Sequence, residues 1–121
     1  MRLNSEFKMY NKVAEFNRYV RNTITNFIPS VHRDIRIHLL DENYSLLHNL
    51  LSASYNKGNI SIKYINEMIV NISMIDYLLG EVLELSENNS KKILRAIRML
   101  SEIKNMIYSW KNNIDNGKEE N

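Results

Sequence analysis

Apolar residues recur at intervals of three and four along almost the whole chain, with polar residues between them. Four rows of this kind follow one another. They are Phe7, Tyr10, Ala14, Asn17, Val20, Ile24 and Phe27; Val31, Ile35, Leu39, Leu46, Leu50 and Ala53; Ile62, Ile65, Ile69, Ile72, Leu79 and Val82; and Ile93, Ala96, Ile97, Leu100, Ile103, Ile107 and Trp110. Because an α-helix has 3.6 residues per turn, each row forms one apolar face of a helix.

Three short polar segments interrupt this pattern. The first contains Pro29, which lacks an N–H and turns the preceding residue away from helical geometry, so one helix should end before it and the next begin beside it. The second, residues 56–59, includes Gly58, which suits a left-handed cap at a helix end. The third, residues 87–90, offers Asn89 or the following serine as a helix N-cap.

The spacing of these breaks predicts four helices joined by short connections. Short connections make consecutive helices antiparallel neighbours, so the fold class that we expect is all-α, an antiparallel up-down-up-down four-helix bundle. A chain of 121 residues has room for one domain, which we place at residues 1–113. The polar residues 114–121 should form a disordered tail.

Additional apolar residues widen these helical faces. Met68, Ile75 and Leu78 lie beside the third row, and Leu94 and Met106 lie beside the fourth. A small bundle needs to bury only one face of each helix, so the surplus indicates self-association or a partner protein. Single apolar residues on an ordinary surface are the alternative interpretation.

Composition excludes several kinds of chemistry. The chain has no cysteine, which rules out disulfides, Cys-ligated zinc, iron–sulfur clusters and a thiol nucleophile. Three glycines and one proline leave no glycine-rich phosphate loop. No apolar run reaches the roughly 20 residues of a membrane span, and the N-terminus has no signal-peptide pattern, so we expect a cytoplasmic protein without membrane contact. Asparagine is abundant, and we attach no function to it.

Basic residues gather in particular segments, although the net charge is only +2. Residues 88–113 contain six basic residues and one acidic residue, whereas residues 60–87 contain one basic and five acidic. Lys91, Arg95 and Arg98 share one face of the fourth helix, and two lysines occupy its first turn, where the helix dipole disfavours cations. This predicts a polyanion-binding surface, with a solvated helix face as the alternative. The candidate nucleic-acid-binding residues are Arg18, Arg21, Arg33, Arg36, Lys91, Lys92, Arg95, Arg98 and Lys104.

The histidines offer little support for catalysis or metal binding. Asp34, His38 and Glu42 fall at i, i+4 steps, but such a row is more typical of a solvated face, so we expect no metal and no cofactor. The segment from Arg33 to His38 resembles the motif of HEPN ribonucleases, in which an arginine is followed by a polar residue, three further residues and a histidine. By this resemblance, Arg33 and His38 would cleave RNA without a metal. The two positions lie about 140° apart on a straight helix, so their side chains would not naturally converge. A ribonuclease of this type is the alternative function.

A broader resemblance spans residues 10–110. It rests first on the segment Phe27-Ile28-Pro29, which is followed by Arg33. It rests also on residues 75–79 of the third helix and on the last part of the fourth helix, Leu100–Trp110. This last part has the pattern Leu-x-Glu-Ile…Met-Ile…Trp. In order and spacing these segments resemble a four-helix-bundle family. That family includes the accessory variability determinant (Avd) proteins of diversity-generating retroelements and proteins encoded in intervening sequences of ribosomal RNA genes.

The resemblance implies a protein that is not an enzyme and that assembles as a homopentameric barrel with a basic surface. Such a protein binds RNA or DNA and a dedicated reverse transcriptase, and it supports mutagenic copying of a template RNA into cDNA. Arg33 carries over as a family feature, with either helix packing or RNA contact as its role. A plain oligomeric helical scaffold that does not bind nucleic acid is a third possibility.

Overall fold

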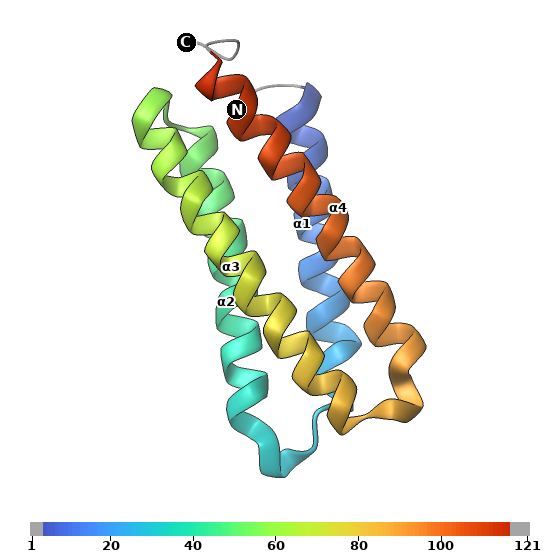
Figure 1. The fold of residues 1–121 in the computed structure, drawn as a ribbon. Coiled ribbons are helices and arrows are strands. Elements are labelled where there is room, and N and C mark those ends of the chain that lie inside the picture. Colours follow the sequence, from blue (N-terminus) through green and yellow to red (C-terminus); the bar gives the residue numbers. More distant parts are fainter. Residues whose placement is uncertain (1–3, 117–121) are drawn as a thin grey trace.

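The structure is a computed structural model, and it describes residues 4–116. These residues form four α-helices: α1 (Asn4–Asn22), α2 (Arg33–Ser54), α3 (Gly58–Leu85) and α4 (Ser90–Asp115). Three short 3-10 turns lie in the links, η1 (Ile24–Phe27), η2 (Ser30–His32) and η3 (Glu87–Asn89), and the described range contains no strand. Figure 1 shows the helices packed side by side as a bundle. The prediction of an all-helical, four-helix fold is confirmed.

Each helix contacts two others. α2 packs on α3, α3 packs on α4, and α1 contacts both α2 and α4. Lys12 of α1 meets Glu102 of α4, whereas Tyr19, further along α1, meets Lys92 near the beginning of α4. These pairs show that α1 and α4 run in opposite directions. The beginning of α1 and the end of α4 accordingly lie at the same end of the molecule (Figure 1).

The core follows the predicted rows closely on α2 and α4. From α2 it takes Ile35, Leu39, Leu46, Leu50 and Ala53, and from α4 it takes Ile93, Ala96, Leu100, Ile103, Ile107 and Trp110. Val31 is the exception, because it belongs to η2 rather than to a helix and is 83% exposed. The 3.6-residue period therefore identified the buried faces of these two helices.

The buried face of α1 differs from the predicted one. Phe7, which we assigned to the core, is 56% exposed. Met9, Val13 and Phe16 are buried instead, whereas Asn17, Val20 and Ile24 of the predicted row are buried as expected. Two rows with helical spacing lie next to each other on this helix. The row centred on Phe16 removes more apolar area from water than the row containing Ala14, and this favours its burial.

The second apolar face that we assigned to α3 is part of the core. Met68 and Ile75 are fully buried and Leu78 is 5% exposed. The reason is that α3 contacts α2 on one flank and α4 on the other, so it buries a wider arc than a single row. These residues therefore do not indicate self-association. The large apolar side chains that α3 does expose along its length are Ile60, Val70, Met74 and Tyr77.

The link between α1 and α2 turns at Pro29, as predicted. Pro29 has extended backbone angles (φ −60°, ψ 149°), and η2 separates it from the first residue of α2, Arg33. The guanidinium of Arg36 donates to the carbonyl oxygens of Thr25 and Ile28, at 3.5 and 3.4 Å. These bonds fasten the beginning of α2 to the turn that follows α1.

The other two links agree with the predicted positions but not with the predicted capping. Gly58 has the left-handed φ that we expected, +57°, but it is the first residue of α3, and α2 ends at Ser54 with Tyr55 as its C-cap. Asn89 occupies the N-cap position of α4 without capping it. Its side-chain amide instead donates to the hydroxyl of Ser86, the residue before η3, at 2.7 Å.

The last helix continues beyond the expected boundary. α4 ends at Asp115, and Ile114, which we placed in the tail, packs partly buried against the core. Residues 117–121 of that expected tail lie outside the described residues. Within residues 4–116, no helix combines the length and the apolar character that crossing a membrane would require.

Asparagines connect the helices inside the bundle. The side-chain amide of Asn49 donates to Asn71 Oδ1 at 2.9 Å. In turn, the amide of Asn71 donates to Glu42 Oε1 at 2.8 Å and to Ser45 Oγ at 3.2 Å. Between α1 and α2, Asn43 donates to the Asn17 carbonyl at 3.2 Å. Part of the asparagine content thus forms polar links in the core.

Candidate nucleic-acid interface

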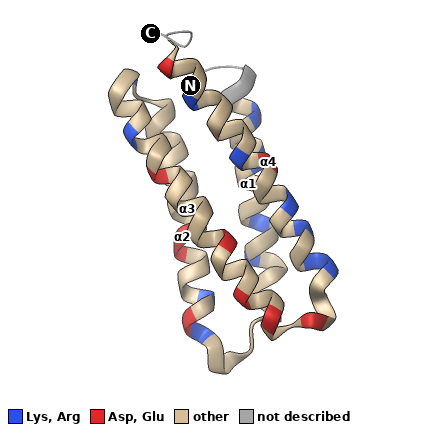
Figure 2. Ribbon diagram, in the orientation of Figure 1, with Lys and Arg blue, Asp and Glu red and all other residues tan. Residues whose placement is uncertain are grey.

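Basic and acidic residues occupy different sides of the bundle. The contacting pair α1 and α4 contains ten Lys and Arg against four Asp and Glu, whereas α2 and α3 contain three against seven. Figure 2 shows Lys and Arg along α4 and α1, with Asp and Glu prominent along α3. We call the surface of α1 and α4 the positive side. A polyanion would approach the molecule from this side.

An open groove of about 290 Å³ lies on the positive side, between the second half of α1 and the first half of α4. It is lined by Glu15, Arg18, Tyr19, Asn22, Thr23, Arg95 and Met99. Its two arginines come from different helices and from distant parts of the sequence. The groove therefore exists only because α1 and α4 pack together.

Aromatic side chains organise the cations beside this groove. The Tyr19 hydroxyl donates a hydrogen bond to the Lys92 carbonyl oxygen at 2.8 Å. The Arg95 guanidinium carbon lies 5.0 Å from the centroid of the Tyr19 ring, and Lys92 Nζ lies 5.9 Å from the centroid of the Phe27 ring. Both distances allow an attraction between the cation and the ring. The first turns of α4 are thus held against the end of α1.

The row of cations on α4 is accessible from solvent. Lys91, Arg95 and Arg98 are exposed, as their i, i+4, i+7 spacing predicted. Within residues 7–116, no carboxylate forms an ion pair with any of the three. Further along the same helices, Lys12 and Glu102 do form one, at 3.0 Å. The uncompensated positive charge is therefore concentrated towards the η3 end of the pair.

Six of the nine predicted binding residues are on the contacting helices α1 and α4, and two of them, Arg18 and Arg95, line the groove. These six are Arg18, Arg21, Lys91, Lys92, Arg95 and Arg98. Arg33 and Arg36 are on the first turns of α2. Arg36 is engaged with the carbonyls of the α1–α2 link, which gives it a role in packing the helices together. Within residues 7–116, no side-chain hydrogen bond or ion pair assigns a role to Arg33.

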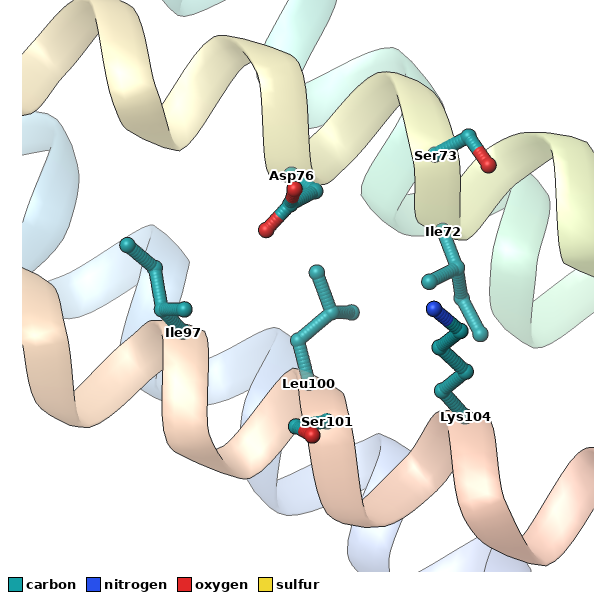
Figure 3. A pocket seen from close by; sticks show the side chains of 7 residues that line it. All are labelled: Ile72, Ser73, Asp76, Ile97, Leu100, Ser101 and Lys104. Atoms are coloured by element: carbon teal, nitrogen blue, oxygen red, sulfur yellow. The ribbon is translucent and has the colours of Figure 1, made fainter.

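Lys104 lies on another flank of α4. It lines a crevice of about 270 Å³ between α3 and α4, together with Ile72, Ser73, Asp76, Ile97, Leu100 and Ser101. Figure 3 shows Lys104 of α4 and Asp76 of α3 at this crevice, with apolar side chains between the helices. Because Lys104 faces α3, it does not extend the row of Lys91, Arg95 and Arg98.

The histidine-based alternatives lack a shared site in this structure. His38 lines a groove between α2 and α3 with His32, Asp34, Ile35, Met74, Tyr77, Leu78 and Glu81, but Arg33 does not. In the row of Asp34, His38 and Glu42, the carboxylate of Glu42 accepts a hydrogen bond from the side-chain amide of Asn71. In the described range, no three His, Asp or Glu residues are grouped so as to hold a metal ion.

Sequence reasoning missed Tyr19 and Phe27 as parts of this interface. Phe27 fits the apolar row of the first helix, and Tyr19 falls outside that row. The signal that could have found Tyr19 is its position between Arg18 and Arg21, since aromatic residues interleaved with basic ones are common in nucleic-acid-binding surfaces. Comparison of the chain with protein-family models, with curated proteins and with solved structures found no match.

Proposed function

We propose that this protein binds nucleic acid on its positive side and serves a reverse transcriptase as a non-catalytic accessory protein. The observation that carries the proposal is the groove between α1 and α4, where Arg18 and Arg95 from two helices line one open space. Guanidinium groups bind phosphate through paired N–H donors, so two of them at one groove suit a phosphate backbone.

The charge of the whole bundle supports this mode of binding. Lys and Arg that neutralise phosphates release condensed counterions, which drives binding at moderate salt. The acidic surplus on α2 and α3 repels the same ligand. Nucleic acid would therefore meet the molecule in one orientation, with α1 and α4 towards it.

The partner and the assembly in this proposal come from the sequence resemblance. We propose a reverse transcriptase of a diversity-generating retroelement as the protein partner, and a homopentamer as the assembly. A homopentamer would present several copies of the groove to one strand, which raises the overall affinity above that of a single groove. Co-purification with a reverse transcriptase encoded beside this gene tests the partner separately.

The nucleic-acid part is tested by removing two charges from the positive side. In the double variant Arg95→Gln, Arg98→Gln, both substitutions are at exposed positions of α4. We expect weaker binding of labelled RNA and DNA, and a slope of log K against log salt that is smaller by about 1.5, because each lost phosphate contact removes about 0.7–0.9. Fluorescence anisotropy between about 50 and 200 mM salt measures both quantities.

Lys63→Gln is the matched control, because Lys63 is an exposed cation on α3, away from the positive side. It should leave the affinity and the slope unchanged. An unchanged slope in the arginine variant, or an equal loss in the control, would contradict the proposal. Absence of binding by the natural sequence at about 150 mM salt would favour the plain scaffold. RNA cleavage that disappears in His38→Ala would favour the ribonuclease.

A further inference from the structure

We infer that the groove between α1 and α4 takes a nucleotide of an unpaired strand, with its base against Arg95 and its phosphate at Arg18. In this arrangement Tyr19 is a positioning residue, because it holds Arg95 in place. The inference rests on the proposed nucleic-acid binding and adds the form of nucleic acid that the groove accepts.

The placement of Arg95 over Tyr19 is the first step. The guanidinium carbon lies over the ring of Tyr19, 5.0 Å from its centroid. Arg95 is exposed, so a ligand can reach its guanidinium from solvent. Unpaired bases stack on guanidinium planes as they do on aromatic rings. Arg95 therefore offers a stacking surface as well as a charge.

Tyr19 is itself fixed, which is the second step. Its hydroxyl donates to the Lys92 carbonyl oxygen at 2.8 Å, and the residue is half-buried against the core. Because the hydrogen bond of its hydroxyl and its packing against the core fix the Tyr19 ring, the ring limits the orientations of the guanidinium above it. A long side chain that is ordered before binding loses less conformational entropy when the ligand arrives.

The other lining residues suit a single nucleotide. Asn22 and Thr23 carry donors and acceptors for the edge of a base, and Glu15 can accept a hydrogen bond from an exocyclic amino group. Arg18, on the same helix, is exposed and can reach a phosphate. The volume of about 290 Å³ is at the small end of the range for ligand sites.

A duplex cannot use these features. Its bases are stacked on one another, so their faces are not available to Arg95, and only its phosphates can contact the groove. Stacking on a side chain is sequence-tolerant and contributes substantially to binding of single strands. The groove should therefore prefer a single strand to a duplex of equal length at equal salt.

The substitution Arg95→Lys tests this, since it keeps the charge and removes the planar group. The probes are a labelled 12-nucleotide RNA without self-complementarity and the duplex formed with its complement. We expect the affinity for the single strand to fall about fivefold or more. The affinity for the duplex should change less than about twofold, and the salt slopes should not change.

Two further comparisons separate positioning from general structural effects. Tyr19→Leu should reproduce the loss for the single strand, whereas Tyr19→Phe, which keeps the ring beneath Arg95, should restore most of the affinity. Arg98→Lys is the matched control, because it makes the same change on the same helix at a residue that does not line the groove. It should change the affinities for the single strand and for the duplex by the same factor, because a phosphate contact does not distinguish the two.

The outcomes distinguish this inference from the proposed function. If the natural sequence binds neither probe, the proposed function fails and the inference fails with it. If the natural sequence binds both and Arg95→Lys weakens them equally, or weakens neither, the inference is overturned while nucleic-acid binding stands. Arg95 is exposed, so this variant tests the inference even if Tyr19→Leu does not fold.

Discussion

Asn71 holds α3 to α2 through three hydrogen bonds. Its Oδ1 accepts from Asn49, and its amide donates to Glu42 and Ser45. The residue is 7% exposed, and Asn49 is 6% exposed. Buried polar groups of this kind stabilise a fold only while each has its partner, because an unpaired group loses its bonds to water without replacement.

We therefore expect Asn71→Ala to lower the free energy of unfolding by about 2 kcal/mol, since it removes three hydrogen bonds and leaves the buried Asn49 amide with only its longer bond, 3.5 Å, to Ser45 Oγ. Urea unfolding followed by circular dichroism measures the change. Asn66→Ala, at an exposed position of the same helix, is the control and should change stability by less than about 0.5 kcal/mol. Similar values for the two variants would show that the polar links do not stabilise the bundle.

At the scale of single elements, α3 contains two glycines in opposite situations. Gly58 begins the helix with φ +57°, whereas Gly80 lies inside it with ordinary helical geometry. At neither position would a Cβ atom meet another atom within 4 Å. Any effect of adding a methyl group therefore comes from the backbone and not from steric contact.

Alanine at these two positions should change stability with opposite signs. Gly58→Ala should lower the free energy of unfolding by about 1 kcal/mol, because an L-residue is strained at this φ. Gly80→Ala should raise it by about 0.5–1 kcal/mol, because alanine loses less backbone entropy in a helix. Chemical denaturation of the two variants beside the natural sequence provides the test. A gain in stability from Gly58→Ala would contradict the strain argument.

At the scale of the whole molecule, the exposed apolar surface suggests where copies could meet. Val70, Met74 and Tyr77 lie at i, i+4 and i+7 on α3, and Val70 and Tyr77 are each more than 60% exposed. They lie on a different side of the bundle from the basic groove. Assembly through this row would leave the positive side free for nucleic acid.

We expect light scattering on a size-exclusion column to give a mass near five times 14.3 kDa, the pentamer of our proposal. Tyr77→Lys should lower this mass, because it places a charge within the apolar row. Tyr55→Lys, the same change at an exposed position at the end of α2, should not. A dimer would favour the ribonuclease alternative, and a monomer would remove the assembly from the proposal.

Much of the fold was predictable because helices depend on neighbours in sequence. The rows of α2 and α4, the turn at Pro29 and the exposure of Lys91, Arg95 and Arg98 all agree with the structure. The first half of the buried face of α1 was mispredicted, because two rows with the same period compete there, whereas Val20 and Ile24 are buried as predicted. Periodicity alone does not say which of them meets the core.

By itself, the sequence determined the helices, their limits to within a few residues and the sign of the charge on each helix. These properties follow from the order and the kind of residues along one chain. The tertiary structure decided which faces meet. Tyr19 and Lys92 are 73 residues apart in sequence, and only the packing of α1 on α4 brings them within 2.8 Å. The groove and its aromatic support result from that packing, and the place of Lys104 at a separate crevice results from the packing of α3 on α4. Such packing depends on the fit of whole helical faces and has no local signal in the chain.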